Sequence, residues 1–287
     1  MRNGMFVSDL DGTLIHGNRS FAPADLDALD ELKARGVVRV IATGRSLFST
    51  RQVLDGAPPG IIDYLIFSSG AGIVDRRSGR LLRSEVMSPE QVRRVAAHLV
   101  KSGEDFMVHE PIPRNHRFVY YRHREHNPDF SRRLDIYRAF ATPHTAERGF
   151  RYREGACQVL VVLPPGEDPA ARVDQLRALF PGLSVVRATS PIDGRSTWIE
   201  LFPRSVSKAQ AAEHLRRLHG VPPALTAALG NDYNDEDLLD WANRSFLVDS
   251  GPDHLARRFT IVTGGLAEAV RLWLDEHDRG AGGAHRE

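Results

Sequence analysis

The sequence has a single cysteine, Cys157, among 287 residues, so no internal disulfide can form and we expect a reducing compartment. It has no charged-then-apolar leader pattern, and no run approaching the roughly 20 apolar residues that a membrane-spanning helix needs. Its formal net charge of +1 gives no electrostatic reason to expect a nucleic-acid or membrane-surface partner. These absences predict a cytoplasmic protein, and 41% hydrophobic with 26% charged residues is typical of a soluble globular chain.

Lysine is also scarce, because only three of the 38 basic residues are lysines. Compositional bias in the coding DNA explains the scarcity. A lysine that is kept where arginine is the rule supplies a compact, strongly hydrated point charge. Lys33 and Lys101 fall on polar faces of predicted helices and need no further explanation. Lys208 is therefore the lysine that we single out as a candidate functional residue.

The first and last parts of the chain alternate apolar strands with helices. This alternation predicts a doubly wound parallel sheet with both faces covered, an α/β fold of the Rossmann-like type. In such sheets, ligands bind beyond the carboxyl ends of the strands. The expected strands are 5–8, 37–42, 64–67, 225–229, 245–248 and 259–262, and the expected helices are 23–35, one from 46, 207–218, 234–241 and 266–276.

The middle of the chain is richer in strands and predicts a second, α+β domain. A hairpin is expected at 72–84, and a capping-box pattern at 88–91 begins a helix. Further strands are expected at 106–110, 117–122, 158–163, 183–187 and 197–201, with helices at 129–140 and 169–179. We therefore predict an α/β core made of residues 1–84 and 199–287, with an α+β cap domain inserted at residues 85–198.

The end of the first expected strand carries two carboxylates. Asp9 and Asp11 flank Leu10, and Gly12 follows them. Alternation along a strand directs the two carboxylates to the same side. Two like charges so close repel each other unless a cation lies between them. The pattern indicates a hard metal ion beside a reacting anion, with Mg²⁺ and a phosphate as the best-fitting combination. An ordinary polar turn is the alternative, because Asp and Gly favour turns in any context.

Four segments of the sequence, in order, resemble the four motifs of the haloacid dehalogenase superfamily of phosphatases. The resemblance covers nearly the whole chain. The large insertion between the second and third motifs is similar to that of the Cof-like and sucrose-phosphatase-like branch, whose α/β cap occupies this place. The four segments are 9–14, 41–45 around Thr43, 206–208 ending at Lys208, and 230–235.

This resemblance implies a chemical role for each motif. Asp9 would attack phosphorus and form an aspartyl-phosphate, while Asp11 would protonate the leaving oxygen and then activate water. Lys208 would neutralise the nucleophile and the phosphate. The implied cofactor is Mg²⁺, bound by the Asp9 carboxylate and the Asp11 backbone carbonyl. The expected catalytic residues are Asp9, Asp11 and Lys208; the expected metal ligands are Asp9, Asp11, Asn231 and Asp235; and the expected substrate-binding residues are Leu10, Thr43, Gly44 and Asn234.

Two positions depart from the family pattern. Asn231 stands where relatives usually carry an Asp ligand, so the site loses one negative charge. We expect Asn231 to occupy the ligand position with Asp235 supporting it, and Asp232 is the alternative ligand if the loop shifts by one residue. The second departure is Ser69, where relatives commonly carry Asn; its hydroxyl can still hydrogen-bond phosphate or the surrounding loop.

The segment 114–133 is rich in arginine, histidine and tyrosine. Nucleic-acid binding is one interpretation, and a zinc site is another. We favour a solvated, Arg-rich face of the cap, because the spacing matches no common zinc pattern and no cysteine accompanies it. A further alternative is that one or two of these residues reach the active site and recognise an anionic or sugar substrate. The zinc interpretation would use His109, His116, His123 and His126.

The sequence therefore predicts a Mg²⁺-dependent phosphatase of small phosphorylated metabolites, with sugar phosphates as the favoured substrates. A phosphotransferase or phosphomutase using the same aspartyl-phosphate is the alternative within enzymes. A non-catalytic phosphate-binding regulator is the alternative from another class, which the Asn231 exchange keeps open. The expected partner is a small phosphate ester, and the sequence indicates no particular oligomeric state.

Overall fold

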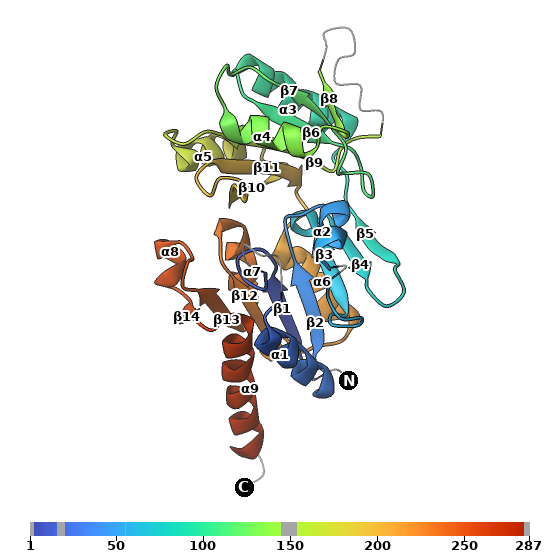
Figure 1. The fold of residues 1–287 in the computed structure, drawn as a ribbon, viewed down its shortest axis with the longest axis vertical. Coiled ribbons are helices and arrows are strands. Elements are labelled where there is room, and N and C mark those ends of the chain that lie inside the picture. The colour runs from blue at the N-terminus through green and yellow to red at the C-terminus, as the bar shows by residue number, and fades with distance from the viewer. Residues whose placement is uncertain (1–2, 16–20, 55, 145–153, 284–287) are drawn as a thin grey trace.

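The computed structural model describes residues 3–15, 21–54, 56–144 and 154–283, which form two β-sheets with helices packed on them (Figure 1). The larger sheet has eight strands in the order β14-β13-β12-β1-β2-β3-β4-β5. Pairing is parallel from β14 to β3 and antiparallel at β4 and β5. The strands are β1 (Met5–Asp9), β2 (Val38–Ala42), β3 (Tyr64–Phe67), β4 (Gly72–Asp75), β5 (Leu81–Ser84), β12 (Thr226–Gly230), β13 (Arg244–Val248) and β14 (Thr260–Val262).

Helices cover both faces of this sheet, which explains why its central strands are apolar on both sides. Phe6 of β1 packs toward α1 and α9, in one hydrophobic cluster with Leu29 and Trp273. Its neighbour Val7 faces the opposite way, toward α6 and α7. The helices are α1 (Pro23–Ala34), α2 (Leu47–Leu54), α6 (Lys208–Leu218), α7 (Glu236–Trp241), α8 (Asp253–Ala256) and α9 (Gly265–Gly283). The predicted α/β class with a doubly wound parallel sheet is confirmed.

The smaller sheet is mostly antiparallel and lies beyond the carboxyl ends of the core strands (Figure 1). Its order is β10-β11-β9-β6-β7-β8. One face packs on α3 and α5, and the other contacts α4 through Phe130. The strands are β6 (Phe106–His109), β7 (Phe118–Tyr121), β8 (Ala141–Pro143), β9 (Gln158–Leu163), β10 (Leu183–Thr189) and β11 (Thr197–Pro203), and the helices are α3 (Pro89–Lys101), α4 (Pro128–Ile136) and α5 (Pro169–Leu179).

Two predicted limits in this region differ from the structure. The boundary between residues 198 and 199 falls inside β11, and the whole of that strand pairs with β10 and β9. The helix expected at 129–140 ends at Ile136, because the chain leaves the helix to pair as β8 with β7. Both differences arise from strand pairing with distant segments, which local sequence patterns do not report. The division into a core and an inserted cap otherwise stays a prediction.

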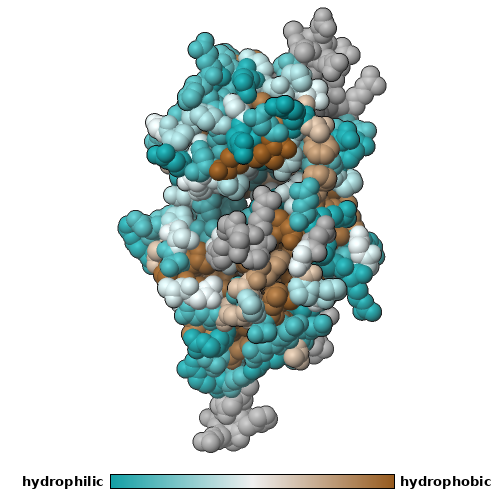
Figure 2. All heavy atoms as spheres, in the orientation of Figure 1, coloured by the Kyte–Doolittle hydropathy of each residue, from teal (hydrophilic) through white to brown (hydrophobic). Residues whose placement is uncertain are grey.

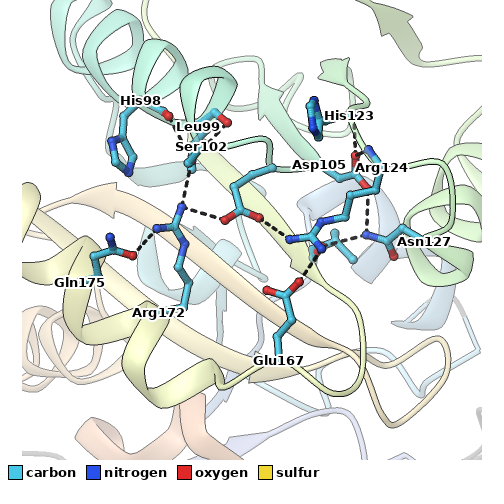
Figure 3. Close-up of polar contacts among 12 residues, drawn as sticks. His98, Leu99, Ser102, Asp105, His123, Arg124, Asn127, Glu167, Arg172 and Gln175 are labelled. Carbon is cyan, nitrogen blue, oxygen red and sulfur yellow. Dashed lines mark hydrogen bonds and ion pairs between the residues drawn. The ribbon is translucent and has the colours of Figure 1, made fainter.

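A buried polar network holds the start of α4 against the smaller sheet, which we call the cap sheet (Figure 3). The Asp105 carboxylate accepts hydrogen bonds from the backbone N–H groups of His123 and Arg124 and from the Asn127 side chain. Asn127 in turn caps the helix by accepting from the Phe130 N–H. Arg124 also forms an ion pair of 3.1 Å with the buried Glu104. These contacts set the position of α4 over the core.

The surface seen in Figure 2 is largely hydrophilic and is hollowed between the parts that contain the two sheets. Among the helices of the described residues, none has the length and apolar character needed to cross a membrane. The expected cytoplasmic location stays a prediction.

Candidate active site

Three neighbouring strands deliver the predicted site residues to one edge of the core sheet. Asp9 ends β1, Thr43 follows β2, and Asn231 follows β12. Because β12, β1 and β2 are adjacent and parallel, their carboxyl ends meet. The predicted residues therefore converge although they are more than 200 positions apart in the sequence.

Lys208 lies at the centre of this convergence. Its Nζ is 2.6 Å from Oδ1 of Asp9 and 2.5 Å from Oδ1 of Asp235, and all three residues are buried. Burial lowers the pKa of Lys208, but the two carboxylates outweigh burial and raise it. Lys208 is therefore a permanent cation, held between the end of β1 and the loop after β12.

The position of Lys208 depends on the start of α6. Ser207 caps this helix by accepting from the Gln210 N–H, and the Asp237 carboxylate accepts from the Ala209 N–H. Gly70 lies against the same turn, and a Cβ at that position would approach Ser207 O to 2.2 Å. With φ of +103°, Gly70 also has a backbone conformation that other residues rarely adopt. The close approach of Gly70 thus brings the loop after β3 against the first turn of α6.

Asp9 is strongly perturbed by its surroundings. Burial raises its pKa to about 8; Asp235 and Asp11 add to the increase, while Lys208 opposes it. Among the described residues, only Lys208 donates a hydrogen bond to the Asp9 side chain, at Oδ1, so Oδ2 is available for another partner. A further cation at this oxygen would favour the ionised carboxylate.

Asp11 does not point at Lys208 but forms a bidentate ion pair with Arg45. Its two carboxylate oxygens accept from Arg45 Nε at 2.7 Å and from an Arg45 terminal nitrogen at 2.6 Å. The guanidinium of Arg45 is thus engaged by a carboxylate of the first motif. The bidentate geometry of this ion pair fixes the orientation of the Asp11 carboxylate.

The expected substrate-binding residues divide into two groups. Thr43 is buried, and its Oγ1 accepts from the Arg45 N–H. A Cβ at Gly44 would lie 3.5 Å from Ser69 Oγ and 3.7 Å from Asn234 Nδ2, so these three residues line one small region beside Thr43. Leu10 differs, because its side chain is fully buried in the hydrophobic core. Only the backbone of Leu10 could contact a ligand.

The polar residues of the loop after β12 make contacts with different parts of the protein. The Asn231 amide lies against the first motif, where a Cβ on Gly12 would come within 2.5 Å of its Nδ2. The Asp232 carboxylate instead binds the N–H and Oγ1 of Thr189 in the cap, at 2.7 and 2.9 Å. Asp235 accepts from the backbone N–H groups of Asn231 and Asp232 and so fixes the loop. The geometry favours Asn231 over Asp232 as the residue that lies against the first motif.

The site offers oxygen ligands for a hard cation, and most of these ligands are uncharged. Within the described ranges, no three His, Cys, Asp or Glu residues group closely enough to hold a metal. The Asp9 carboxylate, the Asp11 carbonyl and the Asn231 amide nevertheless offer the oxygen ligands that Mg²⁺ prefers. Burial is the main cause of the raised Asp9 pKa, and the neighbouring carboxylates of Asp235 and Asp11 add to it, so a cation at this place would be favourable.

Glu200 of β11 was not singled out from the sequence, yet it reaches the site from the cap. This buried carboxylate accepts from Ser69 Oγ at 2.9 Å and from Gln158 Nε2 at 3.2 Å. Burial raises its pKa. The available signal was an acidic residue in the middle of an apolar strand, at a position that shares a face with Trp198.

Two of the six arginines in the Arg-rich segment form ion pairs within the cap. Arg114 pairs with Glu110 and Glu154, and Arg124 pairs with Glu104. His109 is buried, and its Nδ1 lies 2.8 Å from the Asn115 carbonyl oxygen, so it belongs to the packed interior. These contacts explain Arg114, Arg124 and His109 by ion pairing and packing within the protein.

Similar proteins place this chain among the hydrolases of the phosphatase class, and its fold, an α/β core with a second sheet, agrees with that class. A model of the haloacid dehalogenase-like hydrolases matches residues 6–269. The chain therefore belongs to the haloacid dehalogenase-like hydrolase family. The resemblance found in the sequence, including the Cof-like branch, is confirmed, as is the expected class of phosphoric monoester hydrolase.

Individual relatives are distant but match over most of their length. The Bacillus subtilis phosphatase YwpJ is 24% identical over 286 residues, covering 95% of this chain and 96% of the relative. The B. subtilis 5-amino-6-(5-phospho-D-ribitylamino)uracil phosphatase YwtE is 22% identical, covering 89% and 91%. Among solved structures, the phosphatase BT1666 from Bacteroides thetaiotaomicron superposes with a TM-score of 0.75 at 20% identity, covering 95% of both chains. The subclass IIB sugar phosphatase BT4131 gives a TM-score of 0.73 at 17% identity, covering 94% and 98%.

Proposed function

We propose that this protein is a Mg²⁺-dependent phosphatase that hydrolyses small phosphorylated metabolites, with sugar phosphates as preferred substrates, through an aspartyl-phosphate. The observation that carries the proposal is the buried Lys208 between Asp9 and Asp235, with Thr43 at the end of the strand next to that of Asp9. A sugar phosphatase and a ribitylaminouracil-phosphate phosphatase among the similar proteins support a polyhydroxylated leaving group.

In this proposal the reaction proceeds in two displacements at phosphorus. The free oxygen of Asp9 attacks phosphorus, the bond to the leaving oxygen breaks, and protonated Asp11 gives its proton to that oxygen. Ionised Asp11 then takes a proton from water, whose oxygen attacks phosphorus and releases inorganic phosphate and the Asp9 carboxylate. Arg45 binds both carboxylate oxygens of Asp11 and so orients this side chain. Thr43 and the groups around Gly44 would hold the phosphoryl oxygens.

Asp9, the Asp11 carbonyl and Asn231 would hold the Mg²⁺ ion, with Asp235 fixing the loop behind Asn231. When bound, the ion supplies positive charge against the phosphate oxygens. Lys208 supplies a second positive charge from the opposite side of Asp9.

The direct test is phosphate release from a panel of monoesters, including p-nitrophenyl phosphate and several hexose and pentose phosphates. We expect turnover with Mg²⁺ to exceed turnover in EDTA by at least about 100-fold, because charge neutralisation by the metal is worth several kcal/mol. Release to water without an added acceptor distinguishes a phosphatase from a phosphotransferase. Absence of turnover on every ester with Mg²⁺, Mn²⁺ and Co²⁺ would contradict the proposed function.

Replacing Asn231 by Asp should strengthen metal binding. The variant restores a carboxylate at a position facing the first motif, near Gly12. We expect the Mg²⁺ concentration for half-maximal activity to fall by about tenfold, which corresponds to roughly 1.4 kcal/mol. Titration of activity with Mg²⁺ measures the change, and Asn243→Asp on the far side of β12 is the matched control. Weaker Mg²⁺ binding by Asn231→Asp would show that this residue is not a ligand.

A further inference from the structure

The strand β11 brings one face of the cap sheet close to Ser69 and Gly44, which lie beside the expected phosphate-binding residue Thr43. Trp198 and Glu200 share one face of this strand, and Ile199 between them packs on the opposite side with α3 and α5. Glu200 hydrogen-bonds Ser69, whose Oγ lies 3.5 Å from the position of a Cβ on Gly44. Groups beside Glu200 on this face are therefore placed to meet the leaving group of a phosphate ester held at Thr43.

Arg133 of α4 is one of these groups. Its guanidinium carbon lies 4.4 Å from the centroid of the Trp198 ring and 5.2 Å from that of the Tyr137 ring. It also lies within electrostatic range of Glu200. The helix that carries it is anchored through Asn127 and Asp105 (Figure 3). The Arg133 guanidinium is thus in cation–π contact with both aromatic rings.

Arg133 has no ion-pair partner among the residues that the structure describes, unlike Arg114, Arg124 and Arg172 of the same domain. Its buried Nε has no hydrogen-bond partner either. Burial lowers its pKa, so the charged form is not fully compensated. A buried, unpaired cation destabilises the folded protein unless a ligand supplies the missing hydrogen bonds and negative charge.

The two carboxylates nearest to Arg133 are engaged by other donors. Glu200 accepts from Ser69 and Gln158. Asp129 accepts from Ser190 Oγ at 2.6 Å and from Trp198 Nε1 at 2.7 Å. The N–H edge of the guanidinium therefore remains for an outside acceptor, while its faces lie against aromatic rings.

We propose that Arg133 is a specificity-determining residue that binds a second anionic group on the leaving group of the substrate. The preferred substrates would then be phosphate monoesters that carry a carboxylate or another phosphate at the far end. A guanidinium has only donors, and its planar N–H fork matches a carboxylate or phosphate in a bidentate manner. This inference rests on the proposed function, because it concerns the leaving group of the same reaction.

The test compares pairs of esters that differ in the second anion: glycerol 3-phosphate with 3-phosphoglycerate, glucose 6-phosphate with 6-phosphogluconate, and fructose 6-phosphate with fructose 1,6-bisphosphate. We expect wild type to show the higher kcat/KM on at least one anionic member. Arg133→Met should lower the ratio of anionic to neutral kcat/KM by roughly 10- to 100-fold, the worth of a hydrogen bond to a charged group. The change should fall mainly in KM. The first two pairs test a carboxylate, and the third tests a phosphate.

Arg122→Met is the matched control, because Arg122 also stacks on an aromatic ring, that of Phe130, but is exposed. It should leave the ratio unchanged. Arg133→Lys keeps the charge without the planar fork and should give an intermediate ratio, which keeps the test valid if the Met variant does not fold. An unchanged ratio in both Arg133 variants, or no preference for the anionic member of any pair in wild type, would overturn the inference.

Binding separates failure of this inference from failure of the proposed function. Calorimetric titration of Asp9→Asn with 3-phosphoglycerate and glycerol 3-phosphate requires no turnover. Tighter binding of the carboxylate-bearing ester, lost in Asp9→Asn/Arg133→Met, would support the role of Arg133 even if no ester were hydrolysed. Equal binding of both esters, together with turnover of p-nitrophenyl phosphate, would overturn the inference and leave the phosphatase assignment intact.

Discussion

Replacement of Asp9 by Asn should abolish hydrolysis of every phosphate ester. The amide has nearly the shape of the carboxylate but cannot attack phosphorus, so no aspartyl-phosphate forms. We expect kcat/KM to fall by on the order of 10⁴-fold or more, as when a nucleophile is removed from other hydrolases. Phosphate release at saturating Mg²⁺ measures the loss, and acid quenching followed by hydroxylamine cleavage reports the phosphorylated intermediate in wild type.

A matched control separates this effect from a general loss of structure. Asp174 lies exposed on α5 of the cap, with a long 3.6 Å ion pair to Arg177, and Asp174→Asn should retain full activity. Asp9→Asn should still fold, because Lys208 keeps its contact with Asp235. Substantial turnover by Asp9→Asn would identify a different nucleophile.

Replacement of Lys208 by Met should damage both stability and activity. The side chains have similar length, but Met leaves two buried carboxylates, Asp9 and Asp235, without their shared cation. Removing one partner from a buried ion pair typically costs about 3–5 kcal/mol. Loss of a positive charge at the phosphate should lower kcat by roughly 10²- to 10³-fold. Urea unfolding at neutral pH measures the first effect, and steady-state kinetics measures the second.

The pH dependence of the remaining activity provides a sharper readout. Attack requires ionised Asp9, and Lys208 is the group that opposes the increase of the Asp9 pKa caused by burial. Without Lys208 that pKa rises further, so the acidic limb of the kcat/KM profile should move to higher pH. Lys101→Met at the exposed end of α3 is the control and should change neither stability nor the profile. An acidic limb that stays in place would mean that Lys208 does not act on Asp9.

Several features of the fold followed from local sequence patterns. The strand over Tyr64–Phe67 and the helix over Pro169–Leu179 were predicted with the limits that the structure has. The capping box of Ser88 and Gln91 is present at the start of α3. Such features depend on residues within a few positions of one another, so periodicity and capping chemistry suffice to predict them.

Other features depended on segments that are distant in the sequence. The strand β8 and the early end of α4 both follow from the pairing of β8 with β7. The strand that became β7 was expected from the sequence, but the residues that form β8 have no local signal for a strand. Glu200 contacts Ser69 across 131 positions. Arg133 was one of many arginines in a basic segment, and only its neighbours distinguish it from the ion-paired Arg114 and Arg124.

The sequence by itself determined the class of fold and the residue types of the candidate site. The reason is that each motif, including the carboxylates at the end of the first strand, consists of residues that are neighbours in the sequence. It did not determine which charges are compensated. The tertiary structure decided that Lys208 lies 2.6 Å from Asp9 across 199 positions, and that Asp11 pairs with Arg45. It also decided that Arg133 lies against aromatic rings and has no ion-pair partner among the described residues. The physical reason is that desolvation and ion pairing depend on which groups meet in three dimensions, and chain position does not specify that.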